Sequence, residues 1–144
     1  MKKKKTKTDR QKTEAMRKKC VAIAKILSKI RDGYKCRYCG VGKPQGKQVH
    51  SHHIFHEGSH KSMSAEIKNL ITLCASHHQS FAGNKYAFSF HGCPTESTEW
   101  LQENWEYYKE IKILSQKSIH CDIIFWTKKL ANLKEELELS APQQ

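Results

Sequence analysis

Apolar side chains recur every three or four residues between Thr13 and Ile30, in the first quarter of the chain. This spacing places them on one face of a helix, and Asp32-Gly33 supplies a stop signal. The pattern therefore predicts an amphipathic helix over residues 13–33. Its apolar positions are Ala15, Met16, Val21, Ile23, Ala24, Ile26, Leu27 and Ile30.

The segment before this helix has no such pattern. Residues 1–12 are polar and include a run of lysines from Lys2 to Lys5. Low hydrophobicity combined with like charge favours an unfolded chain. The sequence therefore predicts a disordered basic arm over residues 1–12.

The middle of the chain has shorter patterns. Glycines punctuate residues 34–54, and a run with strand-like composition over 48–54 follows the last of them. We expect a two-stranded ribbon in this segment. A polar loop over 56–66 then precedes an apolar run at 67–73, which leads into a short helix opening at Cys74.

The last third of the chain returns to helical spacing. Apolar residues lie on one stripe over 95–114, and a second helical pattern covers 119–139. Residues 95–139 are therefore expected to form a helical packing segment. Helices on both sides of a small ribbon place the chain in the α+β class.

Charge and length limit the partners and the size of the site. The 144 residues suffice for one compact domain. Lysine and arginine number 26 against 14 acidic residues, a formal charge of +12, which favours a phosphate-rich partner and DNA first. The alternative is that the lysine run is only a solvated tail. Candidate nucleic-acid contacts are Lys2, Lys3, Lys4, Lys5 and Arg37.

The sequence contains neither a long apolar run for crossing a bilayer nor an apolar stretch near its start typical of a signal peptide. We expect no membrane partner and a location in the cytoplasm. In that reducing compartment, cysteines serve as metal ligands or buried thiols more often than in disulfides. The sequence indicates no oligomeric state.

Two pairs of soft ligands have the same short spacing. Cys36 and Cys39 form a C-x-x-C motif, and Cys74 and His77 repeat that spacing with histidine in the second place. Three thiolates and one imidazole fit a closed tetrahedral zinc site. We therefore predict a structural zinc ion that joins the start of the ribbon to the start of the short helix.

This arrangement, with its histidines, resembles the HNH nucleases, a branch of the ββα-metal nucleases. The chain has Cys36-x-x-Cys39, His52-His53-Ile54, an Asn69-to-Cys74 segment and then Ala75-Ser76-His77-His78. These are similar, in order, to the family's C-x-x-C, [DH]-H-I, N-L-x-x-L-C and C-x-x-[CH]-[HN] elements. The stretch from Phe88 to Pro94, followed by Trp100-Leu101, is similar to phage-encoded members.

The resemblance implies a small ββα-metal core over residues 34–94 with a structural zinc knuckle, acting as a metal-dependent DNA endonuclease in a bacterial or phage-infected cell. It places His53 on the general base and His52 and His78 on ligands of one divalent ion, such as Mg²⁺, Mn²⁺, Ni²⁺ or Zn²⁺. Asn69 matches the asparagine that holds the loop against the ribbon and is grouped with the catalytic residues. His91 is the candidate third ligand, although it follows His78 by 13 residues, where many relatives have only a few.

The chemistry of these side chains agrees with that implication. A neutral imidazole can take a proton from water near physiological pH, and a divalent ion with open positions can act on a phosphate. A zinc-stabilised nucleic-acid-binding module without catalysis remains an alternative, as does a nuclease directed at RNA. A binding module has no reason to pair His53 with His78 beside a zinc knuckle, so the endonuclease is favoured. His50, His56 and His60 receive no role.

Overall fold

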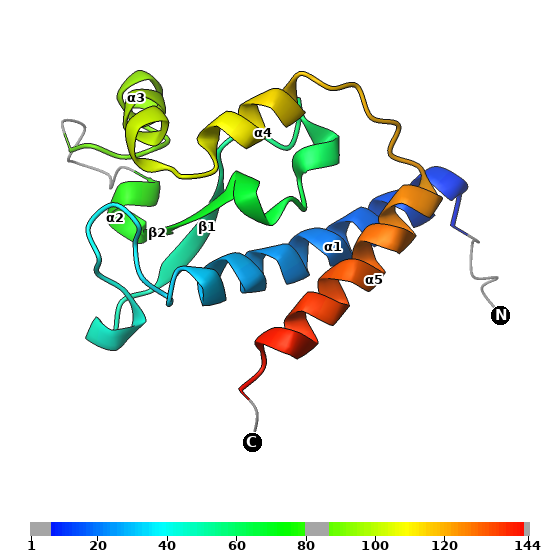
Figure 1. The fold of residues 1–144 in the computed structure, drawn as a ribbon, viewed down its shortest axis with the longest axis horizontal. Coiled ribbons are helices and arrows are strands. Elements are labelled where there is room, and N and C mark those ends of the chain that lie inside the picture. The colour runs from blue at the N-terminus through cyan, green and yellow to red at the C-terminus, as the bar shows by residue number, and fades with distance from the viewer. Residues whose placement is uncertain (1–6, 80–86, 143–144) are drawn as a thin grey trace, which may run out of the picture.

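The structure is a computed structural model that describes residues 7–79 and 87–142. The elements follow one another as a long helix, a two-stranded antiparallel hairpin, a short helix and three further helices (Figure 1). This confirms the predicted α+β class. The elements are α1 (Asp9–Arg31), β1 (Val49–His53), β2 (Leu70–Cys74), α2 (Ala75–His78), α3 (Pro94–Asn104), α4 (Tyr108–Ser115) and α5 (Ile123–Ser140).

Helix α1 begins at Asp9, four residues before the predicted start. A capping box explains the difference: Thr8 N donates to Gln11 Oε1 at 2.9 Å, and Gln11 N donates to Thr8 Oγ1 at 3.3 Å. Residues 9–12 are therefore helical rather than part of the predicted arm. At the other end the helix stops at the predicted place, where Gly33 has a positive φ of 61°.

The glycine pattern predicted a hairpin within residues 34–54, but the hairpin of the structure extends beyond that segment. Strand β1 instead pairs with the apolar run that forms β2, with Val49 opposite Cys74 and His53 opposite Leu70. The intervening loop contains two short 3₁₀ turns, Lys61–Met63 and Ile67–Asn69. This pairing brings the two histidines of β1 next to the strand that leads into α2.

The two faces of the hairpin pack against different helices. Leu70 belongs to a cluster formed mainly by α1 and α5, which lie side by side, whereas its neighbour Ile71 packs with residues of α3 and α4 (Figure 1). Opposed residues of a hairpin share a face, so His52, opposite Ile71, lies on the α3 and α4 side. His53, opposite Leu70, lies on the α1 side.

The C-terminal pattern is interrupted where the sequence predicted a continuous stripe. Trp105 is 3 % exposed and extended, and it separates α3 from α4. Its indole N–H donates to the Lys68 carbonyl at 3.0 Å. This bond connects the segment between α3 and α4 to the loop before β2. The last helix starts at Ile123 instead of residue 119, because the Asp122 side chain caps it by accepting from Phe125 N at 2.8 Å.

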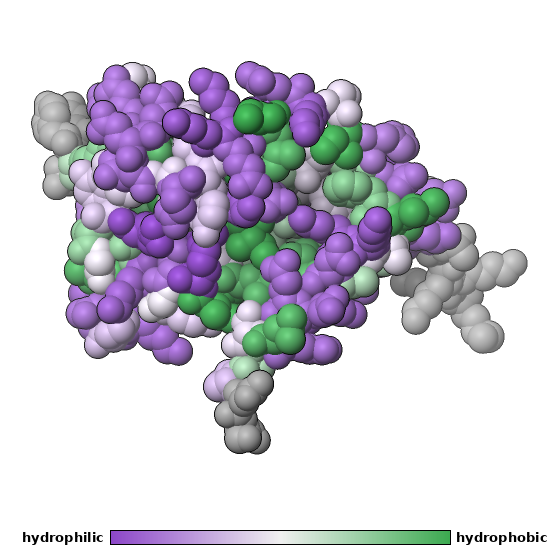
Figure 2. Space-filling model, viewed as in Figure 1, coloured by the Kyte–Doolittle hydropathy of each residue, from purple (hydrophilic) through white to green (hydrophobic). Residues whose placement is uncertain are grey.

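Hydrophilic residues cover most of the molecular face in Figure 2, with hydrophobic residues exposed in separate groups. Among the described residues, no helix combines the length and apolar character needed to cross a membrane.

Candidate metal centres

The first candidate centre gathers the two short-spaced ligand pairs. Cys36 and Cys39 lie in a turn in which Gly40 N donates to the Cys36 carbonyl at 2.8 Å, while Cys74 ends β2 and His77 lies in α2. Their four ligand atoms all lie within 4.8 Å of one another. The Cys39 and Cys74 sulfur atoms are 3.9 Å apart, and Cys74 Sγ lies 3.2 Å from His77 Nδ1.

These distances suit one small tetrahedral ion. Zinc–sulfur bonds of about 2.3 Å place two sulfur ligands about 3.8 Å apart at tetrahedral angles. Donors of this kind at such separations fit Zn²⁺ in a closed structural site. The centre joins the 36–39 turn to the junction of β2 and α2, as expected from the spacing.

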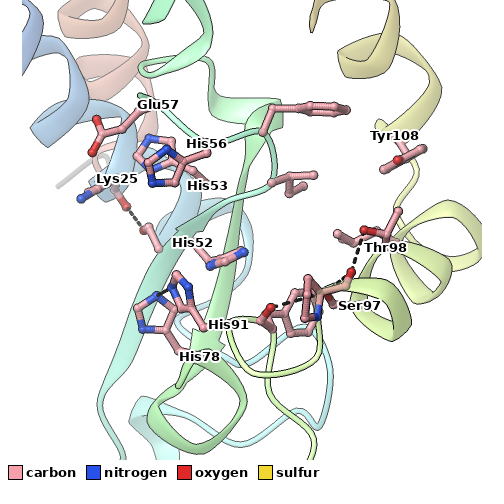
Figure 3. A pocket seen from close by; sticks show the side chains of 16 residues that line it. Lys25, His52, His53, His56, Glu57, His78, His91, Ser97, Thr98 and Tyr108 are labelled. Carbon is pink, nitrogen blue, oxygen red and sulfur yellow. Dashed lines mark hydrogen bonds between the residues drawn. The ribbon is translucent and has the colours of Figure 1, made fainter. Parts of the chain in front are cut away.

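The second candidate centre consists of His52, His78 and His91, whose ligand atoms again lie within 4.8 Å of one another. They come from β1, α2 and the segment before α3, and Figure 3 shows their rings turned toward one another. The Nε2 atoms of His78 and His91 are 3.2 Å apart. Metal–nitrogen bonds of about 2.0–2.1 Å place neighbouring ligand nitrogens about 3.0–3.4 Å apart, so this separation suits a shared ion.

Backbone hydrogen bonds bring His91 to this centre despite its distance in sequence. Phe90 N donates to the His77 carbonyl at 2.8 Å, and His91 N donates to the His78 carbonyl at 3.3 Å. The segment carrying His91 is thereby fastened to α2. The spacing of 13 residues from His78 is thus compatible with a shared centre.

The surroundings keep two of these imidazoles neutral. Burial, helped by the nearby His91 and His78 rings, lowers the pKa of His52 to about 3. Burial and the neighbouring His91 and His50 rings lower the pKa of His78 to about 4. Neutral imidazole is the metal-binding form, so protons do not compete for these nitrogens at neutral pH.

His50 belongs to the surroundings of the second centre, although no motif assigns it a role. It lies on the same strand face as His52, and its ring stacks on that of His78 with centroids 5.3 Å apart. This contact supports the orientation of His78. Alternation along the strand predicts that His50 and His52 share a face but does not predict the stacking partner.

His53 lies apart from the three histidines and has a different environment. Its Nε2 is 2.8 Å from the carbonyl oxygen of Ser64. A carbonyl only accepts, so Nε2 carries the proton and the neutral ring keeps its lone pair on Nδ1. Burial lowers the pKa of His53, although the bond to Ser64 opposes this shift. The neutral form, able to accept a proton, is therefore favoured.

Both groups of histidines line one cavity of about 520 Å³. Consecutive residues from Ser51 to Glu57 contribute to its wall, so it receives side chains from both faces of β1. Figure 3 shows His52, His78 and His91 on one part of the wall, with His53, His56, Glu57 and Lys25 beside them and Ser97, Thr98 and Tyr108 opposite. A ligand in this cavity can contact His53 and the second centre together.

Asn69 holds the loop between the strands and does not line the cavity. It is fully buried, and its amide donates to the carbonyls of Phe55 at 3.0 Å and Met63 at 3.2 Å. Its side-chain oxygen accepts from Phe55 N at 2.8 Å. These bonds join the start of the loop, at Phe55, to Met63 further along it.

The predicted nucleic-acid contacts have different outcomes. Lys2, Lys3, Lys4 and Lys5 lie outside the described residues. Arg37 donates to Glu106 at 3.0 Å, lies 3.5 Å from Asp32 and covers the Trp105 ring, and it does not line the histidine cavity. These contacts fix the position of the Arg37 side chain beside Trp105 and Glu106, and its contact with nucleic acid stays a prediction.

Sequence patterns did not reveal three charged residues close to His53. Lys25 and Glu57 line the cavity, and Arg17 donates to Glu57 at 2.9 Å while also pairing with Glu14 at 2.6 Å. The Arg17 contact ties the loop after β1 to α1. No spacing in the sequence could have shown this, because Arg17 and Glu57 meet only through the packing of the helix on the hairpin.

Comparisons of the chain with protein-family models, curated proteins and solved structures found no match.

Proposed function

We propose that this protein is a metal-dependent endonuclease of the HNH type that hydrolyses phosphodiester bonds in DNA. The observation that carries this proposal is the position of His53, whose Nε2 donates to the Ser64 carbonyl, so that the lone pair of the neutral ring is on Nδ1. It lines the same cavity as the three-histidine centre formed by His52, His78 and His91. A base beside a metal centre is a pairing that can hydrolyse a phosphodiester bond.

The donor set fits a catalytic ion. Three imidazoles supply three ligands, and catalytic metal sites commonly use three protein ligands so that other coordination positions stay open. When bound, a divalent ion such as Mg²⁺, Mn²⁺, Ni²⁺ or Zn²⁺ would stabilise negative charge on the phosphoryl group and on the departing oxygen. His52, His78 and His91 hold the ion in this proposal.

His53 takes the proton from the attacking water. Because Nε2 is occupied by the Ser64 carbonyl, Nδ1 is the accepting atom, and the carbonyl can stabilise the imidazolium that forms. His53 follows His52 directly in β1 but lies on the opposite face, which keeps the base from becoming a ligand. Asn69 holds the loop that follows β1, and this loop forms part of the cavity wall.

The Cys36, Cys39, Cys74 and His77 centre binds a structural Zn²⁺ in this proposal. It fixes the end of β2 and the start of α2, so it sets the position of His78 directly after His77. A closed set of soft ligands leaves no position for water. The zinc ion therefore contributes to the geometry of the site and takes no part in the chemistry.

DNA is favoured as the partner by the charge of +12. A cleavage survey tests this with plasmid DNA, single-stranded DNA, branched DNA and RNA, each with added Mn²⁺ and without it. We expect cutting of DNA only when Mn²⁺ is present. His120→Ala is a matched control, because His120 is exposed and lies outside the histidine cavity. Cutting of RNA alone would contradict the DNA assignment, and binding without any cutting would favour the zinc-stabilised binding module.

A further inference from the structure

Helix α1 contributes one cationic side chain, Lys25, to the wall of the histidine cavity. Figure 3 shows it beside His53 and Glu57, on the side of β1 that faces α1. The same cavity is lined by His53 and by His52, His78 and His91, so Lys25 shares its wall with the base and with the three-histidine centre.

Hydrogen bonds between α1 and β1 fix the backbone of Lys25 at this place. Ser51 Oγ donates to the Lys25 carbonyl at 3.1 Å and lies 2.9 Å from Ser28 Oγ, one helical turn further on. Ser51 shares its strand face with His53, because side chains alternate along a strand. The helix is thus held against the strand next to the base, and the Lys25 side chain starts from a fixed point.

The ammonium group of Lys25 has no partner among the described residues: neither an ion pair nor a side-chain hydrogen bond involves it. The carboxylate on the same wall, Glu57, is instead paired with Arg17 at 2.9 Å. Arg17 neutralises the negative charge that would otherwise repel a phosphate or compete for Lys25. The half-buried lysine thus presents an available positive charge to the cavity.

We infer that Lys25 binds a non-bridging oxygen of the substrate phosphate during cleavage. This rests on the proposed nuclease function and adds a residue that lies outside the hairpin and α2. Lysine acts on a phosphate as a compact point charge, and a fixed cation beside the phosphate stabilises the charge that develops in the transition state. Lys25 and the three-histidine centre would approach the phosphate from different sides of β1.

The matched variants are Lys25→Met, Lys25→Arg and Lys19→Met. Lys19 is exposed on the same helix and lines none of the cavities described, so its variant removes one charge without changing the site. With supercoiled plasmid DNA and saturating Mn²⁺, Lys25→Met should lower kcat about 100- to 1,000-fold, the range for loss of one fixed transition-state contact. Lys25→Arg should restore part of the rate, and Lys19→Met should cleave as the parent protein does.

Two further measurements separate substrate binding from indirect effects. Manganese affinity and melting temperature should be unchanged in Lys25→Met, whereas a loss of either that parallels the loss of cleavage would overturn the inference. Binding of a labelled duplex is measured without added divalent ion at several salt concentrations. The slope of log affinity against log salt should be smaller by about 0.9 in Lys25→Met, which corresponds to the loss of one phosphate contact. Cleavage by Lys25→Met at the parental rate would also overturn it.

The slope measurement distinguishes the two proposals. If the parent protein cuts no nucleic acid, the nuclease function fails, and the salt slope of Lys25→Met still reports whether Lys25 contacts a phosphate. If the parent protein cuts and Lys25→Met cuts equally well, the nuclease function stands and the role of Lys25 fails.

Discussion

The Nε2 atom of His53 donates a hydrogen bond to the carbonyl oxygen of Ser64 at 2.8 Å, which joins the end of β1 to the loop that precedes β2. The acceptor is a backbone atom, so the arrangement depends on the loop conformation and not on a partner side chain. It fixes the tautomer in which Nδ1 can accept a proton. In the proposed mechanism, the state of the base therefore depends on how this loop is held.

Replacement of His53 by alanine should remove the chemical step while leaving ion binding intact. Loss of a general base lowers rates about 100- to 10,000-fold. We expect this loss in plasmid cleavage, with manganese affinity by calorimetry and duplex binding close to those of the parent protein. Cleavage at the parental rate by His53→Ala would exclude the proposed mechanism.

The three histidines of the second centre should respond differently from His53. His52→Ala, His78→Ala and His91→Ala each remove one ligand atom from a set within 4.8 Å, so affinity for Mn²⁺ or Ni²⁺ should fall together with activity. Excess metal should restore part of the activity, because the remaining ligands still bind weakly, whereas excess metal should not restore His53→Ala. Intact metal affinity in His91→Ala would limit the set to two histidines.

Asn69 should matter for stability more than for binding. Asn69→Ala leaves the N–H and carbonyl of Phe55 and the carbonyl of Met63 without their side-chain partner in a buried place. Unpaired buried groups cost about 1–3 kcal/mol each, so the loss of three partners should lower the free energy of unfolding by at least about 3 kcal/mol. Urea denaturation measures it, with Asn104→Ala as the control because Asn104 is an exposed helix-end asparagine. A loss no larger than that of the control would contradict the loop-holding role.

The structural centre should be essential for folding of the region around α2. Cys39→Ser replaces one of four soft ligands, and removal of zinc by a chelator should likewise lower the melting temperature. Elemental analysis should show about one tightly held zinc in the parent protein and a loss in the variant. Cys93→Ser serves as control, since Cys93 lies outside the cluster. Equal melting temperatures for the two variants would contradict a structural zinc.

Local patterns predicted the parts of the fold that depend on neighbouring residues. Helical spacing located α1, and the Asp32-Gly33 signal located its end. The capping box at Thr8 was readable in principle, but the predicted start followed the apolar stripe and came four residues late. Helix boundaries depend on single capping contacts, which the apolar pattern does not contain.

Long-range relationships could not be predicted in the same way. The apolar run at 67–73 has no alternation, so the sequence did not reveal that β2 pairs with β1. The ligand spacing predicted that Cys36, Cys39, Cys74 and His77 would meet, because the motif itself carries that information. Lys25 and Arg17 reach the cavity only through the packing of α1 on the hairpin, and no motif marks them.

The start of the chain provides a test of DNA binding that is separate from catalysis. Deletion should stop at residue 6, since Thr8 caps α1 and residues 9–12 form its first turn. Removing residues 1–6 takes away Lys2, Lys3, Lys4 and Lys5. Each phosphate contact contributes about −0.9 to the slope of log affinity against log salt, so the slope should flatten by up to about 3.6 while Mn²⁺-dependent cleavage persists at low salt. A slope equal to that of the full chain would show that this lysine run is a solvated tail.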